Sequence, residues 1–273
     1  HGQELQAVFR LEGIRDVRTC SAHALERAVR TEDRPAGKAP VTPGAENANR
    51  NDDVLERRLS LKGIQQLALQ ISSLANDGRQ VSLVSSGAVG TAMTLLDSDR
   101  PTGLGLLQAY AAIGQAELIQ QYNREFEKHG KRAAQVLLTI DDMDDRQRYL
   151  NLRNTFISLF ELGAIPVINE NDCVATEEIS VTFGDNDRLA ANVAMLVDAD
   201  LLIILSDVDA LYDRNPREAD ACRIGWVEQL DDRTRKAAVD PGGEGRSFSK
   251  GGMSSKMEAA AMAASVGIPT SHF

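Results

Sequence analysis

Short apolar runs alternate with amphipathic segments over most of the chain, and this alternation limits the folds that the chain can adopt. The first amphipathic segment carries apolar residues at helical spacing from Ile64 to Ala75, and Asn76-Asp77-Gly78 ends it. The predicted strands are 81–84, 134–138, 165–168 and 201–205, and the predicted helices are 64–75, 106–129, 145–162, 188–196 and 253–266. Repeated strand–helix units of this length predict an α/β fold, a three-layer αβα sandwich around a mostly parallel sheet with right-handed crossovers.

Residues 1–50 differ from the rest of the chain because they show no sustained periodicity. Residues 32–51 contain several proline and glycine turns, which are typical of a flexible segment. We therefore expect an irregular segment at 1–50 and one domain at 51–273.

The composition limits the class of protein. The chain has 273 residues, 42% of them hydrophobic but only 4% aromatic, which suits parallel strands covered by aliphatic helices. Its net charge of -10 argues against nucleic acid or an anionic membrane as the main partner. Three cysteines far apart form no zinc or disulfide pattern, and no run of apolar residues reaches transmembrane length. These features predict a cytoplasmic enzyme.

Polar residues follow three of the predicted strands directly. They are Ser85-Ser86-Gly87, then Asn169-Glu170-Asn171-Asp172, then Ser206-Asp207. Each group alone has the composition of a turn or a helix cap. Because ligands bind beyond the carboxyl ends of parallel strands, the three groups together favour a binding site at that edge of the sheet.

Two further segments precede predicted helices. Gly184-Asp185-Asn186-Asp187 has the composition of an ordinary turn with an N-cap, but Asn186 could also bind a substrate carboxylate or ammonium, with Asp187 orienting cationic groups. The segment from Lys250 to Lys256 contains Gly251-Gly252 at the start of the last predicted helix. Paired glycines and a helix N-terminus suit a phosphate, although this pair alone is weak evidence.

Taken in order, these motifs resemble those of the glutamate 5-kinases, a branch of the amino acid kinase superfamily. The resemblance covers roughly residues 50–268, and its motifs are 84–88, 167–175, 184–189, 205–212 and 251–256. The Ser-Ser-Gly-Ala and Asn-Glu-Asn-Asp motifs separate this branch from the aspartate, acetylglutamate, carbamate and uridylate kinases.

The resemblance implies ATP-dependent phosphorylation of the γ-carboxylate of L-glutamate, the first step of proline biosynthesis. It implies that Ser86, Asp172 and Asn186 hold glutamate, and that Lys256 and Asp187 are catalytic. It implies that ATP is contacted by Ser206, Asp207, Lys250, Gly251, Gly252, Met253, Ser254, Ser255 and Lys256. Mg²⁺ would be held by the nucleotide phosphates rather than by a protein metal site. Family members are often inhibited by proline and often form homo-oligomers, and neither nucleic acid nor membrane is an implied partner.

The N-terminal segment departs from the family pattern. Family members open with a strand followed by Lys-x-Gly-[ST]-[ST], which grips the phosphates, and nothing in residues 1–50 matches it. Lys38 has no predicted strand before it, and Lys250 replaces a usual threonine. We expect the kinase domain at 51–273 to lack terminal strands at both ends, residues 1–50 to be aberrant, and the RNA-binding-like C-terminal domain of some members to be absent.

Two alternatives to an active glutamate kinase stay open. The chain could be a related kinase that acts on another small carboxylate. It could also be a catalytically impaired chain that binds glutamate or proline, because losing a cationic phosphate clamp costs orders of magnitude in rate.

Overall fold

The computed structural model describes residues 5–10 as backbone, together with residues 61–174, 186–205, 211–213, 220–225, 227 and 253–272. Five predicted nucleotide-site residues lie outside these ranges: Ser206, Asp207, Lys250, Gly251 and Gly252. Within the same ranges, none of the helices has the length and apolar character that a membrane crossing requires.

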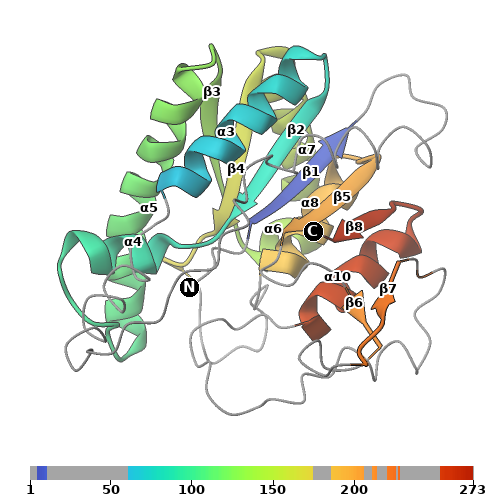
Figure 1. Cartoon of the computed structure of the whole chain (residues 1–273). Coiled ribbons are helices and arrows are strands. Elements are labelled where there is room, and N and C mark those ends of the chain that lie inside the picture. The colour runs from blue at the N-terminus through green and yellow to red at the C-terminus, as the bar shows by residue number, and fades with distance from the viewer. Residues whose placement is uncertain are drawn as a thin grey trace, which may run out of the picture.

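A six-stranded sheet forms the middle layer (Figure 1). Its strands lie in the order β3 (Arg132–Leu138), β4 (Ala164–Glu170), β2 (Gln80–Ser85), β1 (Leu5–Arg10), β5 (Leu201–Leu205) and β8 (Thr270–His272). β3 and β4, β4 and β2, and β5 and β8 pair in parallel, whereas β1 is antiparallel to both β2 and β5. Five strands therefore run in one direction, and the prediction of a mostly parallel sheet is confirmed.

The central strand β1 is a correction, because residues 1–50 were expected to be irregular and Leu5–Arg10 are not. Leu5 lies opposite Ser85 and Leu205, and Arg10 lies opposite Gln80, so β1 begins at the edge where β2 and β5 end. Six residues are too few for a clear periodic signal. The strand is favoured by its position, since it pairs the backbone groups of two buried strands that would otherwise face each other unpaired.

β8 is a second strand that the sequence did not predict. It adds three residues beside β5, at an edge where a terminal strand was expected to be missing. β6 (Leu211–Tyr212) and β7 (Arg223–Ile224) form a separate antiparallel pair.

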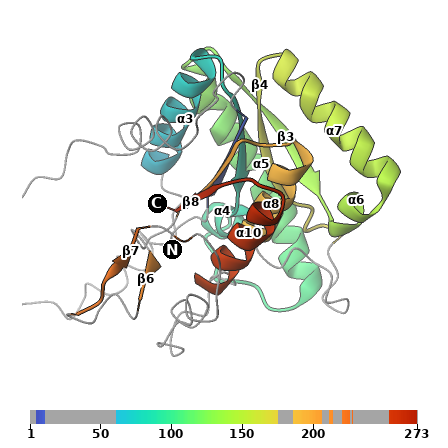
Figure 2. The ribbon, with the colours of Figure 1, turned by 90° about the vertical axis from the view of Figure 1, so that its right-hand side faces the viewer.

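Helices cover both faces of the sheet, as expected for the three-layer sandwich; Figure 2 shows α3 and α7 on opposite sides. α3 (Leu61–Asn76) and α5 (Leu104–Glu127) bury Ile64, Leu118 and their neighbours against one face. α7 (Arg146–Glu161), α8 (Asn186–Leu196) and α10 (Met253–Ser265) pack on the other face. Two short helices, α4 (Ala88–Leu95) and α6 (Ile140–Asp144), were not predicted because neither is long enough for a repeated apolar stripe.

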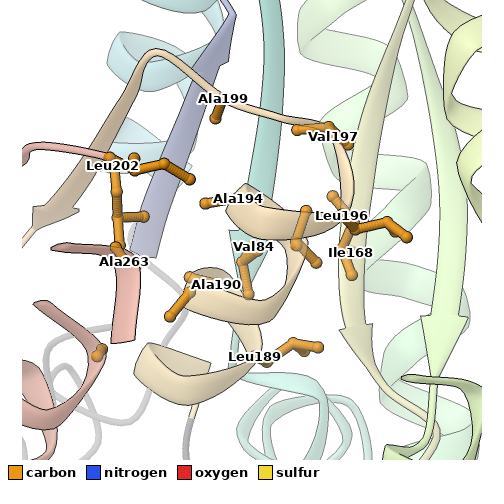
Figure 3. Close-up of a cluster of buried hydrophobic side chains, with 14 of the residues drawn as sticks. Val84, Ile168, Leu189, Ala190, Ala194, Leu196, Val197, Ala199, Leu202 and Ala263 are labelled. Carbon is orange, nitrogen blue, oxygen red and sulfur yellow. The ribbon is translucent and has the colours of Figure 1, made fainter. Parts of the chain in front are cut away.

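Small residues let α8 lie close to the sheet and to α10. Figure 3 shows Ala190 and Ala194 of α8 in one cluster with Val84 of β2 and Ala263 of α10. All four side chains are fully buried. An alanine brings the helix backbone nearer to its neighbour than a larger residue would, so this core also brings the first turns of α8 and α10 together.

Candidate active site

The parallel strands β2 and β4 end side by side, and their last residues begin the candidate site. Val84 pairs with Ile168, so the residues that follow each strand emerge at the same edge of the sheet. Ser86 follows β2 and Asp172 follows β4, and both are partly exposed there. This edge is the one that the sequence motifs indicated, because ligands bind beyond the carboxyl ends of parallel strands.

The turn after β2 depends on a glycine. Gly87 has φ +107° and is the N-cap of α4, a left-handed conformation that L side chains rarely adopt. Its carbonyl oxygen accepts hydrogen bonds from Thr91 N at 2.9 Å and from Thr91 Oγ1 at 2.8 Å. These two bonds hold the Ser86-Gly87 turn against the first turn of α4.

α5 packs directly against this turn through a second glycine. A Cβ atom at Gly114 would overlap the carbonyl oxygen of Ala88 and lie 2.7 Å from Ala92 N. Only glycine therefore permits this crossing of α4 and α5. The crossing fixes the position of α4 and, with it, the end of β2.

A line of buried amide side chains connects α5, β4 and α8. Asn169 Nδ2 donates to Gln115 Oε1 at 2.9 Å, and Asn186 Nδ2 donates to Asn169 Oδ1 at 3.4 Å. The exposed fractions are 8% for Gln115, 5% for Asn169 and 9% for Asn186. We call these three residues the amide relay. Asn186 was expected at the site, but Gln115 and Asn169 were not assigned a role. The signal that could have found Gln115 is a polar residue in register with the buried positions Ala111 and Leu118 of α5.

The next residue of α8, Asp187, joins the first turns of α8 and α10. Its Oδ2 atom accepts hydrogen bonds from Ser255 Oγ at 2.8 Å and from Lys256 Nζ at 3.1 Å. Asp187 is fully buried and Lys256 is 7% exposed. Their charges interact strongly, because solvent screens a buried pair far less than a surface pair.

Tyr122 supports the end of β2 from α5. The Tyr122 hydroxyl and Ser85 Oγ are 2.9 Å apart, and both side chains are buried. Burial raises the pKa of the Tyr122 phenol well above its ordinary value, while the hydrogen bond to Ser85 acts in the opposite direction. The phenol is therefore protonated at neutral pH.

The structure brings only some of the predicted site residues into contact. One connected group on α8 and α10 contains four of them: Asn186, Asp187, Ser255 and Lys256. Asn186 also links this group to the rest of the amide relay. Met253 is partly buried and Ser254 exposed in the same first turn of α10. Among the residues with described placement, no three or more of His, Cys, Asp and Glu form a group that could hold a metal ion. The described group offers a buried cation, a carboxylate that orients it and nearby amides, which suits binding and stabilising an anion.

Comparisons of the sequence with known proteins show which family the chain resembles. A model of the amino acid kinase family matches residues 45–271. The chain is similar to a protein named glutamate 5-kinase from Rhodopirellula baltica, with 49% identity over 214 residues that cover 78% of this chain and 54% of the relative. It is similar to glutamate 5-kinases from Caldanaerobacter subterraneus subsp. tengcongensis, with 48% identity over 77% of this chain and 56% of the relative, and from Pseudomonas savastanoi pv. phaseolicola, with 48% identity over 74% and 54%. The chain thus spans about half the length of the curated relatives it matches.

Proposed function

The chain belongs to the amino acid kinase family, and from that premise we propose that it phosphorylates the γ-carboxylate of L-glutamate with ATP, the first step of proline biosynthesis. A carboxylate oxygen of glutamate would form a new bond to the γ-phosphorus of ATP. The bond from that phosphorus to the bridging oxygen would break, giving L-glutamyl 5-phosphate and ADP. The relatives named glutamate 5-kinase support this choice of substrate.

One observation carries the proposal: the buried pair of Lys256 and Asp187 lies one residue from the amide relay. Phosphoryl transfer needs positioning and stabilisation of negative charge more than it needs a proton acceptor. The γ-carboxylate is already ionised at neutral pH, so no general base is required. Lys256 would neutralise charge on the transferring group, and Asp187 would hold the ammonium in place.

Three residues that follow β2 and β4 or begin α8 would hold glutamate. Asn186 belongs to the amide relay, and Ser86 and Asp172 follow the neighbouring strands β2 and β4. An amide, a hydroxyl and a carboxylate together suit the mixed charges of an amino acid, because the carboxylate can accept from the ammonium and the others can donate to carboxylates.

The first turn of α10 suits the phosphates of ATP. Its N–H groups and the positive end of the helix dipole favour anions, and Ser254, Ser255 and Lys256 lie in that turn. We also assign the nucleotide to Ser206, Asp207 and residues 250–252, outside the described residues, from the resemblance alone. Mg²⁺, a hard cation that prefers oxygen ligands, would be bound chiefly by the nucleotide phosphates.

The remaining parts of the proposal rest on the resemblance. They are a cytoplasmic location, assembly into a homo-oligomer and feedback inhibition by proline. Neither nucleic acid nor membrane is a proposed partner.

One observation favours a second candidate, a catalytically impaired chain that binds glutamate or proline. β1 ends at Arg10 beside Gln80, at the edge of the sheet away from Ser86. The C-terminal end of β1 therefore lies at the edge of the sheet opposite the candidate site, whereas the family pattern has a lysine following the first strand.

An assay of glutamyl phosphate formation separates these candidates. The chain is incubated with MgATP, L-glutamate and hydroxylamine, and glutamyl hydroxamate is measured; the same assay with other small carboxylates tests the related-kinase alternative. The active candidate predicts hydroxamate. Glutamate binding in calorimetry without hydroxamate or ADP release would instead support the impaired candidate.

Replacing Lys256 tests the residue roles. Lys256→Met keeps most of the side-chain volume and removes the charge, and we expect kcat to fall by about 100-fold or more. Lys128→Met is the matched control, because Lys128 is exposed and pairs only at the surface with Glu125. Equal rates in the two variants would contradict the role of Lys256.

A further inference from the structure

We propose that Gln115 is a positioning residue that fixes the orientation of the substrate-binding amide of Asn186 through Asn169; this inference rests on the proposed function. Gln115 does not reach Asn186 directly. It accepts from Asn169 Nδ2, and Asn169 Oδ1 in turn accepts from Asn186 Nδ2.

The direction of each bond in the amide relay depends on the one before it. Because Gln115 offers its oxygen, Asn169 must turn its Nδ2 towards α5 and its Oδ1 towards α8. Asn169 Oδ1 then accepts a hydrogen bond from Asn186 Nδ2. If the Gln115 amide were rotated by half a turn, its Nε2 would face Asn169 Nδ2, and two donors would oppose each other. The acceptor Gln115 Oε1 therefore determines the orientation of both asparagine amides.

Gln115 is held in place more firmly than the other end of the amide relay. The preceding residue, Gly114, is packed against the backbone of Ala88 and Ala92, and buried Ala111 and Leu118 lie on the same side of α5. This crossing leaves the helix little freedom to shift. Asn186, in contrast, is the first residue of α8 and makes the longer bond of the relay, at 3.4 Å.

A purely structural role explains the position of Gln115 less well. An apolar side chain at a buried helix position avoids the cost of removing an amide from water. In the described part of the chain, the hydrogen bond that compensates this amide is to Asn169, whose other bond leads to the proposed glutamate site. The amide relay thus ends at Asn186, which would contact the substrate.

The test compares variants of similar size on α5. Gln115→Met keeps the length and removes the acceptor, whereas Gln115→Glu keeps an acceptor oxygen for Asn169. Gln121→Met is the matched control, because Gln121 lies on the same helix and its Nε2 donates to the neighbouring Glu117 Oε1 at 3.2 Å rather than to the amide relay. Gln115→Asn serves if Gln115→Met does not fold, since it keeps the amide but is too short to reach Asn169.

Rates are measured first with varied glutamate at saturating MgATP, and then with varied MgATP at saturating glutamate. We expect Gln115→Met, or Gln115→Asn, to raise the KM for glutamate about tenfold, the cost of one lost buried acceptor, and to leave the KM for MgATP within about twofold. We expect Gln115→Glu to recover most of the glutamate affinity and Gln121→Met to resemble the native chain. An unchanged glutamate KM in the Gln115 variants, or equal shifts of both KM values, would overturn the positioning role.

A spectroscopic readout keeps this inference separate from the proposed function. If the native chain neither binds glutamate nor forms hydroxamate, the proposed function fails. The side-chain amide NMR signals of Asn169 and Asn186 are then compared between the native chain and its variants. Signals that shift in Gln115→Met but not in Gln121→Met support the relay, and an unmoved Asn186 signal overturns it.

Discussion

At the scale of single residues, the pair of Asp187 and Lys256 is costly to bury. Removing two charges from water costs several kcal/mol for each ion, and their mutual attraction repays this only with good geometry and further hydrogen bonds. Ser255 supplies one such bond to the carboxylate oxygen that also binds Lys256. A pair of this kind contributes little net stability, so its value lies in holding a cation at one place in the site.

Tyr122 gives a prediction about alkaline pH. Burial raises the pKa of its phenol above the ordinary value of about 10, so the folded state keeps the proton that the unfolded state loses. The stabilising contribution is full below about pH 10 and is lost above it, by about 1.4 kcal/mol per pH unit. We expect Tyr122→Phe to weaken this loss, measured by urea unfolding between pH 9 and about 11.

The control for this prediction is Tyr110→Phe, which removes a hydroxyl 2.9 Å from Ser98 Oγ, in the segment that follows α4. The unfolding free energies of both variants and of the native chain are compared over the same pH range. An identical slope in Tyr122→Phe and the native chain would show that Tyr122 does not produce the effect.

The sequence predicts the site residues unevenly. Asn186, Asp187 and Lys256 were identified because they stand in recognisable motifs, and the structure places them together. Gln115 and Asn169 were not assigned roles, because an amide becomes informative only when its buried partner is known. Their bond joins residues on α5 and β4 that no local pattern connects.

At the scale of elements, the crossing of α4 and α5 depends on Gly114. We expect Gly114→Ala to destabilise the fold by about 2–4 kcal/mol, because the new Cβ would overlap the Ala88 carbonyl and backbone cannot move aside cheaply. Since α4 carries the turn at Ser86, the glutamate KM should rise as well. Thermal unfolding and rate measurements check both effects.

Replacing Gly105, on the same helix, should have the opposite effect on stability. A Cβ atom there meets nothing within 4 Å, and the residue lies in the first turn of α5. Gly105→Ala should be neutral or stabilise by up to about 1 kcal/mol. If both alanine variants behaved alike, close packing at Gly114 would not be the cause.

Long elements were more predictable than short ones. The helix predicted at 106–129 is observed at Leu104–Glu127, and the strand at 201–205 is observed as predicted. α6 has five residues and is stabilised by a capping box of Thr139 and Asp142 rather than by an apolar stripe. Its existence depends on hydrogen bonds that periodicity does not reveal.

At the scale of the whole molecule, β1 joins two groups of strands. Without it, the sheet would divide into β3-β4-β2 and β5-β8. We expect Val8→Pro to destabilise the fold by about 3 kcal/mol or more, because Val8 pairs with both Ser82 and Leu202 and proline removes a backbone donor. Chemical unfolding measures this, and Val8→Ala, which keeps the N–H, should cost less.

The parallel arrangement of the sheet was predicted, whereas the reversed central strand was not. Alternation of strands and helices determines how consecutive elements connect, and four of the six strands, β2 to β5, were predicted from it. The direction of β1 is set by pairing with strands far away in the sequence. Such contacts leave no local pattern.

The position of β1 also has a consequence for how the chain reaches this structure during synthesis. Leu5 is synthesised well before Leu205, with which it pairs, and β2, β3 and β4 lie between them in the sequence. Until β5 is made, the edge of β1 that pairs with β5 stays open, and contacts between residues so distant in sequence form slowly. The sheet would therefore be completed only after β5 emerges, and until then the open edge of β1 would be exposed to wrong pairing.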